Sequence, residues 1–213
     1  MSDPEHGWRW YAYLAGRCLA NLPRAVRNPA PVVDALINLE REAAWTAELS
    51  GFDRIGSLTL AERLFLHWLC THVPIRTAFE IGTGHGWTTR LLAEYAKEVY
   101  TLDLPGRADV SCRHPYVTCL AGDSMTFDFS PYEGRMDLVF VDGGHDRRTV
   151  EHDSAVAERL RTPRGVIVWH DCNIQHRDVW AFLRDLRTRI PIVRVENTRF
   201  AVKLGNGLLE ALP

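Results

Sequence analysis

The stretch FEIGTGHGWTT, residues 79–89, decides the fold class of this chain. Its first residues continue a short apolar run that carries the acidic residue Glu80, and residues 88–96 have helical spacing. Between them lie three glycines at every second position, Gly82, Gly84 and Gly86. Glycine permits positive φ angles and a close approach of a ligand, and the N-terminus of the next helix offers unpaired N–H groups. The stretch predicts a strand, a ligand-binding turn and a helix.

Short apolar runs alternate with amphipathic stretches on both sides of this loop. Strand-like runs occupy residues 77–82, 98–103, 116–122, 136–142 and 165–170, and the tail segments PIVRVEN and RFAVKLG offer two more. Residues 88–96, 149–160 and 179–190 have helical spacing. Strands covered on both faces are nearly continuous in apolar residues, as these runs are. The series predicts an α/β fold with a Rossmann-like, seven-stranded, mostly parallel sheet and helices on both faces.

Residues 1–75 precede the first strand, and we expect them to form an N-terminal helical extension to the domain of residues 76–213. Apolar spacing is helical after Pro31, and Thr59 with Glu62 forms a TxxE capping box that starts a helix. Three interpretations stay open for the aromatic residues near the N-terminus: a substrate pocket, a docking face or core packing. These residues are Trp8, Trp10, Tyr11 and Tyr13.

Composition favours a small-molecule ligand. The 213 residues carry a formal net charge of -2, which gives no basic footprint for nucleic acid. Five cysteines without a CxxC pair argue against a disulfide framework or a structural zinc site, and fit a reducing cytoplasm. No apolar run approaches the roughly 20 residues that span a bilayer. We therefore expect a cytoplasmic protein without a membrane span, and a homo-oligomer stays open.

The spacing E-x-G-x-G-x-G resembles motif I of the class I S-adenosylmethionine-dependent methyltransferases. A dinucleotide fingerprint would have its third glycine where Trp87 stands, so a dehydrogenase is disfavoured. The resemblance implies that Glu80 and the loop residues hold the amino-acid end of S-adenosylmethionine. These loop residues are Gly82, Thr83, Gly84 and Gly86. An ordinary glycine-rich turn is the alternative.

Two further strand ends carry groups that the same resemblance assigns to the cofactor. Asp103 ends the second strand-like run, where the family has a carboxylate that accepts hydrogen bonds from the ribose hydroxyls. Asp123 and Ser124 follow the third run, where the family places a polar group against the adenine. Asp103 could instead cap its turn, and Asp123 could be a turn former.

The segments MDLVFVDGGHD and VIVWHDCN resemble the O-methyltransferase branch that includes the catechol and caffeoyl-coenzyme A enzymes and those that tailor macrolides and cephalosporins. The resemblance implies that Asp142 touches both cofactor and acceptor and is the first ligand of a divalent metal. His170 and Asp171 are the other candidate ligands. Bound Mg²⁺ would lower the pKa of an acceptor hydroxyl and orient it. Hard oxygen ligands suit Mg²⁺, whereas His170 and Cys172 suit softer ions, and Asn173 completes an oxygen set only if the chain turns.

In the catechol-type enzymes a lysine is the general base at the position of His145. An imidazole with a pKa near 6.5 can take a proton from a hydroxyl at neutral pH. A loop histidine bonded to backbone is the alternative. The sequence thus predicts an S-adenosylmethionine-dependent O-methyltransferase with Asp142, His145 and Asp171 at its catalytic centre. A metal-independent N-methyltransferase and a non-catalytic cofactor-binding protein are the other hypotheses.

Overall fold

A computed structural model describes residues 58–107, 114–195 and 198–208. Most of the N-terminal extension, with the aromatic residues between Trp8 and Tyr13, lies outside these ranges. The capping box is confirmed: Thr59 N–H donates to Glu62 Oε2 at 2.7 Å, and Glu62 N–H donates to Thr59 Oγ1 at 3.3 Å. It starts helix α4 (Leu60–His72).

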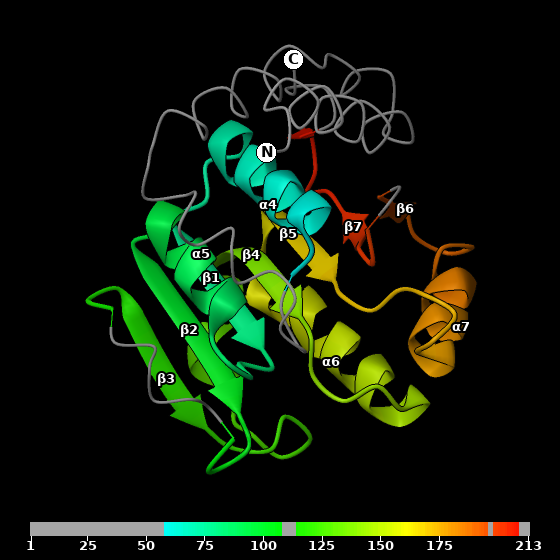
Figure 1. The fold of residues 1–213 in the computed structure, drawn as a ribbon, viewed down its shortest axis with the longest axis horizontal. Helices are drawn as coiled ribbons and strands as arrows, with labels where there is room; N and C mark the ends of the chain where they lie inside the picture. Colours follow the sequence, from blue (N-terminus) through cyan, green and yellow to red (C-terminus); the bar gives the residue numbers. More distant parts are fainter. Residues whose placement is uncertain (1–57, 108–113, 196–197, 209–213) are drawn as a thin grey trace, which may run out of the picture.

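The described chain is built on one seven-stranded sheet with the order β3-β2-β1-β4-β5-β7-β6 (Figure 1). The strands are β1 (Thr77–Ile81), β2 (Glu98–Asp103), β3 (Val117–Ala121), β4 (Met136–Val141), β5 (Arg161–Trp169), β6 (Val193–Arg194) and β7 (Ala201–Lys203). Strands β1 to β5 pair in parallel, and β7 runs antiparallel to both β5 and β6. The predicted mostly parallel sheet is confirmed, and all five parallel strands point their carboxyl ends to one edge.

Helices cover both faces of the sheet. Successive side chains of a strand point to opposite faces. In β4, Leu138 and Phe140 join the apolar cluster of α4 and α5 (Trp87–Tyr95). Val139 and Val141 join the cluster of α6 (Arg147–Leu160) and α7 (Arg177–Leu186). Figure 1 shows α4 and α5 together on one face. A short 3-10 helix, η2 (Ser130–Tyr132), precedes β4.

Two strands differ from the sequence prediction. Strand β3 is at the edge of the sheet and is mostly exposed, although its apolar residues suggested cover on both faces. Strand β5 begins at Arg161 instead of Gly165, because polar residues and Pro163 hide its first half from an apolar pattern. Neither difference moves the carboxyl ends of the strands, where the site lies.

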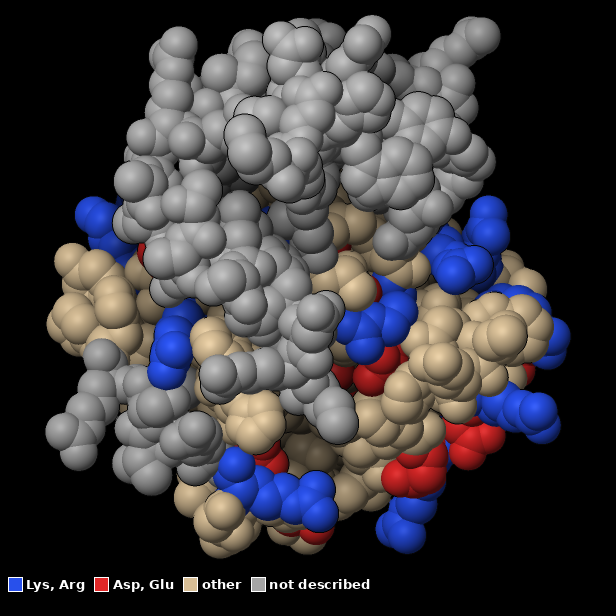
Figure 2. All heavy atoms as spheres, in the orientation of Figure 1, with Lys and Arg blue, Asp and Glu red and all other residues tan. Residues whose placement is uncertain are grey.

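None of the described helices is long and apolar enough to cross a bilayer. Figure 2 shows the Lys and Arg side chains in several separate groups, with Asp and Glu side chains among them.

Candidate active site

The glycine loop between β1 and α5 has the geometry that its sequence predicts. Gly82, Gly84 and Gly86 have φ angles of 97°, 48° and 70°. A Cβ atom on Gly82 would lie 2.1 Å from the carbonyl oxygen of Asp142, so no other residue fits at this position. A Cβ on Gly84 would meet nothing within 4 Å, so open space lies beside the loop. The loop is pressed against the end of β4 on one side and is open on the other.

Glu80 lies under this loop and is almost fully buried. Its Oε2 atom accepts hydrogen bonds from the hydroxyl groups of Thr89 at 2.5 Å and Thr101 at 2.6 Å. Burial outweighs these hydrogen bonds and raises the pKa of Glu80 to about 8. The side chain therefore ties β1 to β2 and α5, and it also lines the cavity described below.

Asp103, at the end of β2, holds the glycine loop from the other side. Its Oδ2 atom accepts hydrogen bonds from the backbone N–H groups of Thr83 at 3.1 Å and Gly84 at 2.8 Å. Its Oδ1 atom accepts from the N–H of Leu104 at 2.7 Å. The two sequence interpretations of Asp103 are thus compatible, since the carboxylate caps its turn and also faces the cavity.

The residues after β3 show a similar double use. Asp123 forms a turn, because its Oδ1 atom accepts from the N–H of Met125 at 2.9 Å. Ser124 hydrogen-bonds to Asp153, a fully buried carboxyl group of α6 whose pKa is raised by burial. Asp123 and Ser124 both line the cavity as well.

These groups surround one cavity of about 700 Å³ at the carboxyl edge of the sheet. Its lining includes the glycine loop, Asp103, Asp123, Asp142, His145 and Asp171. Every predicted cofactor residue except Gly86 lines it, and every predicted catalytic or metal residue does too. Parallel α/β sheets bind ligands outside the carboxyl ends of their strands, and this cavity has that position.

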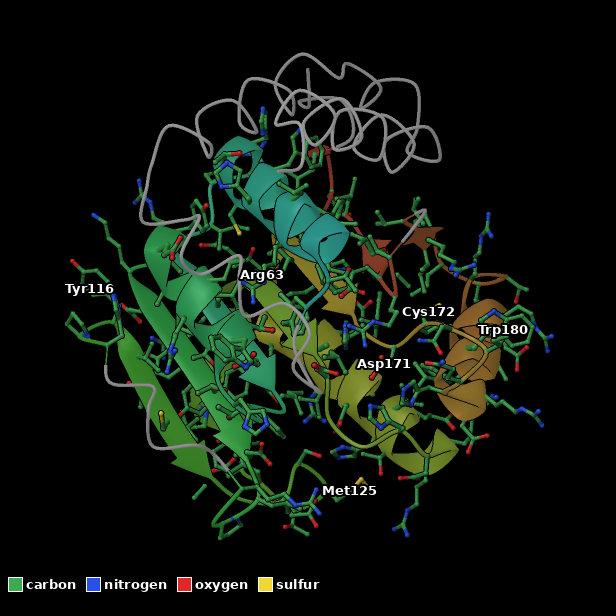
Figure 3. The ribbon with its side chains drawn as sticks, viewed as in Figure 1. Arg63, Tyr116, Met125, Asp171, Cys172 and Trp180 are labelled. Carbon is green, nitrogen blue, oxygen red and sulfur yellow. The ribbon has the colours of Figure 1, made fainter. Side chains whose placement is uncertain are left out.

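The loops after β4 and β5 bring His145 and Asp171 together. The Nε2 atom of His145 lies 2.9 Å from Oδ2 of Asp171. The hydrogen bond from His145 to Asp171 raises the pKa of the imidazole, and partial burial opposes the rise. Although burial alone would raise the pKa of Asp171, hydrogen bonds from His145 and His170 hold it well below its usual range. Figure 3 shows Asp171 on the loop between β5 and α7, with Cys172 beside it.

His170 is buried between three carboxylates. Its Nδ1 atom lies 3.0 Å from Asp142 Oδ1 and 3.5 Å from Asp171 Oδ2, and its Nε2 atom lies 3.6 Å from Glu62 Oε2. Burial alone would lower the pKa of His170, but the charge of Asp142, the hydrogen bond to it and the nearby carboxylates of Asp171 and Glu62 raise it to about 11. The imidazole is therefore a cation at neutral pH.

Arg199 supplies the second cation of this network. It makes a two-pronged pair with Glu62, with Nε to Oε1 and Nη2 to Oε2 both at 2.9 Å. Its Nη1 atom lies 3.3 Å from Asp171 Oδ1. Its carbonyl oxygen accepts from the N–H of Cys172 at 2.8 Å. These contacts hold Asp171 in a left-handed conformation with φ 53°, which a residue other than glycine adopts at a cost of about 1–2 kcal/mol.

The donor set at Asp142, His170 and Asp171 does not fit Mg²⁺. The imidazole of His170 lies between the two carboxylates, where a hard cation would need oxygen. Asn173 does not complete an oxygen set, because its Oδ1 atom accepts from the N–H groups of Gln175 at 2.8 Å and His176 at 3.1 Å. The three side chains are therefore not arranged as a Mg²⁺ site.

Three residues of the site were not found from the sequence. His176 lies 3.6 Å from Asp171 through its Nε2 atom, and its ring centroid is 4.1 Å from that of His145. The sequence feature that could have indicated His176 is Asn173, a turn former three residues earlier. Arg199 is the first residue of the predicted strand segment RFAVKLG and belongs to no motif. Glu62 was recognised only as a helix cap, because its second role depends on contacts 137 residues away in sequence.

Comparison with known proteins agrees with this geometry. Residues 79–172 match the model of a family described as a methyltransferase domain. A search of curated proteins gives no significant match.

Solved structures share the fold. A protein from Staphylococcus aureus, provisionally assigned as a caffeoyl-CoA O-methyltransferase, has a TM-score of 0.61 at 13% identity, over 79% of this chain and 96% of that one. A cofactor-bound protein from MTB has a TM-score of 0.57 at 23% identity, over 82% and 96%. A provisionally assigned O-methyltransferase from Klebsiella pneumoniae has a TM-score of 0.56 at 18% identity, over 83% and 90%. The chain spans only 58% of the length of two spermidine synthase structures that it also matches.

The sheet order, the glycine loop and the family match over residues 79–172 support a class I S-adenosylmethionine-dependent methyltransferase. Within that class, the chain resembles the caffeoyl-CoA O-methyltransferase branch in its fold. The residues fit S-adenosylmethionine. Open space lies beside Gly84, acidic groups end β2 and follow β3, and a single cavity joins them to the loops after β4 and β5.

Proposed function

We propose that this protein transfers the methyl group of S-adenosylmethionine to a hydroxyl group of a small molecule, with His145 as the general base. The observation that carries the proposal is the hydrogen-bonded pair of His145 and Asp171 in the same cavity as the glycine loop. A base and an orienting carboxylate at the place where donor and acceptor meet is the arrangement that proton removal requires.

The chemistry follows from this pair. S-adenosylmethionine supplies an electrophilic methyl group, which the acceptor oxygen attacks as the bond from methyl to sulfur breaks. Because Nε2 of His145 is bonded to Asp171, Nδ1 is the nitrogen that takes the proton of the acceptor hydroxyl. The negative charge of Asp171 stabilises the imidazolium that forms. Asp142 holds the imidazole of His170 at the wall of the cavity and faces the acceptor.

The groups at the ends of β1 to β3 would hold the cofactor. The glycine loop would contact its amino-acid end, with Glu80 fixing the loop from below. Asp103, already positioned by Thr83 and Gly84, would accept from the ribose hydroxyls. Asp123 and Ser124 would face the adenine. Binding from three strand ends would place the reactive methyl group before His145.

The test is a screen of the purified full chain for formation of S-adenosylhomocysteine. One arm contains small hydroxyl compounds such as phenols and sugars, and the other contains amines of matched size. We expect turnover with hydroxyl compounds only, at a rate that EDTA does not reduce. Turnover with amines only would contradict O-methylation. Binding of S-adenosylmethionine by calorimetry with no turnover in either arm would favour the non-catalytic alternative.

A further inference from the structure

We propose that His145, Asp171 and His176 form a binding site for a divalent transition metal ion of intermediate softness, with Zn²⁺ as the probe. This set differs from the predicted metal ligands Asp142, His170 and Asp171, since it shares only the carboxylate with them. It takes one ligand from the loop after β4 and two from the segment between β5 and α7.

The ligand atoms are already close to one another. Oδ2 of Asp171 lies 2.9 Å from Nε2 of His145 and 3.6 Å from Nε2 of His176, and the three ligand atoms all lie within 4.8 Å of one another. Metal bonds of about 2.1 Å place neighbouring ligand atoms roughly 3.0–3.5 Å apart. The three atoms therefore need only small movements to share one ion.

The surroundings fix these ligands in place. Asp171 keeps its second oxygen, Oδ1, for Arg199, which Glu62 holds in turn. Asn173 fixes the backbone of His176 through the hydrogen bond to its N–H. Partners of this kind orient the ligands of metal sites and are part of their affinity. The side chain of His145 is 46% exposed and that of His176 is 29% exposed, so an ion can enter and keep open positions.

Two imidazoles and one carboxylate select the kind of ion. Imidazole nitrogen suits zinc, nickel, cobalt and iron, whereas magnesium requires a mainly oxygen shell. His170 is not part of this set, because its Nδ1 atom is hydrogen-bonded to Asp142 at 3.0 Å. The site should therefore bind Zn²⁺ in the presence of a large excess of Mg²⁺.

Occupancy of this site by Zn²⁺ has a consequence for catalysis, which rests on the proposed function. His145 cannot hold a metal ion and take a proton from the acceptor at the same time. Bound Zn²⁺ would therefore inhibit methyl transfer by the mechanism proposed above. Metal binding itself needs no acceptor and can be measured independently of the reaction.

The test is a calorimetric titration of the purified full chain with Zn²⁺ in buffer that contains excess Mg²⁺. We expect one saturable site whose affinity falls at least tenfold in His176→Asn. His176 is the N-cap residue of α7, and Asn is favourable at an N-cap, so the variant should keep its folded stability. The matched control is His114→Asn, three residues before β3, and it should leave the affinity unchanged.

The result that would overturn the site is Zn²⁺ binding that is absent, or equally strong in the wild type, His176→Asn and His145→Asn. Thermal unfolding of each variant checks that the fold is kept. Zinc binding that depends on His176, with no turnover on any acceptor, would support the site and leave the proposed function without support. Turnover that depends on His145, without zinc binding, would support the function and reject the site.

Discussion

The Nε2 atom of His145 and the Oδ2 atom of Asp171 lie 2.9 Å apart, although one residue follows β4 and the other follows β5. The contact joins the loops after β4 and β5, which both line the cavity. It raises the pKa of the imidazole, and in the proposed mechanism it leaves Nδ1 of His145 to take the proton of the acceptor. The predictions about the reaction depend on this pair.

His145→Asn should lower kcat by about 10²–10⁴, the usual contribution of a general base. Binding of S-adenosylmethionine should be retained, because the glycine loop and Asp103 are untouched. The measurements are initial rates on an acceptor from the hydroxyl screen and calorimetry with the cofactor. His114→Asn is the control, and a similar loss in both variants would argue against a specific role of His145.

The pH profile should report the same pair. His145 acts as a base only when neutral, and its pKa is raised from 6.5. The value of kcat/KM should therefore rise with pH and level off above an apparent pKa higher than 6.5. In Asp171→Asn the hydrogen-bonded charge is gone, so the apparent pKa should fall. A profile that is flat through this range, or unchanged in Asp171→Asn, would contradict the assignment.

Gly82→Ala should abolish cofactor binding and strongly destabilise the fold. Its φ of 97° disfavours alanine, and the new Cβ would lie 2.1 Å from the backbone of Asp142. We expect a loss on the order of 3 kcal/mol, which sums a left-handed cost of about 1–2 kcal/mol and overpacking. Gly134→Ala is the control, because Gly134 has φ 67° and no atom within 4 Å of its Cβ position. It should lose only about 1–2 kcal/mol and keep binding, as urea unfolding and calorimetry would show.

The sequence was sufficient to predict the sheet, the glycine loop and the edge of the sheet where the carboxyl ends of the parallel strands lie together. Apolar runs, helical spacing and glycine spacing are local signals, and parallel strands place their carboxyl ends together whatever their exact register. For this reason Asp142, His145 and Asp171 could be expected near one another before any coordinates were known. The edge position of β3 could not be predicted, because it depends on strand order.

The network of His170, Arg199 and the three carboxylates around His170 could not be predicted from local sequence patterns. Arg199 and Glu62 meet only because β7 inserts beside β5 and α4 packs over them. The sequence indicated His170 only as a candidate metal ligand, because two of its three carboxylate neighbours, Glu62 and Asp142, are distant from it in the chain. Asn173 looked like a candidate ligand, but its amide oxygen closes a turn. Residue type alone does not separate these uses.

His170→Asn should destabilise the protein in a pH-dependent way. The buried imidazolium balances Asp142, Asp171 and Glu62, and breaking such a network leaves buried charge without a partner. We expect a loss on the order of 3 kcal/mol and a Tm lower by roughly 6–12 °C.

The pKa of His170 is raised from 6.5 to about 11 in the folded protein, so the contribution of His170 to stability is complete below pH 6.5 and is lost as pH rises toward 11. Urea unfolding across this range should show the difference between wild type and variant shrinking with rising pH. Glu151→Gln, on the exposed side of α6, is the control and should change little. A difference that stays constant or grows with pH would show that His170 is not the cation of this network.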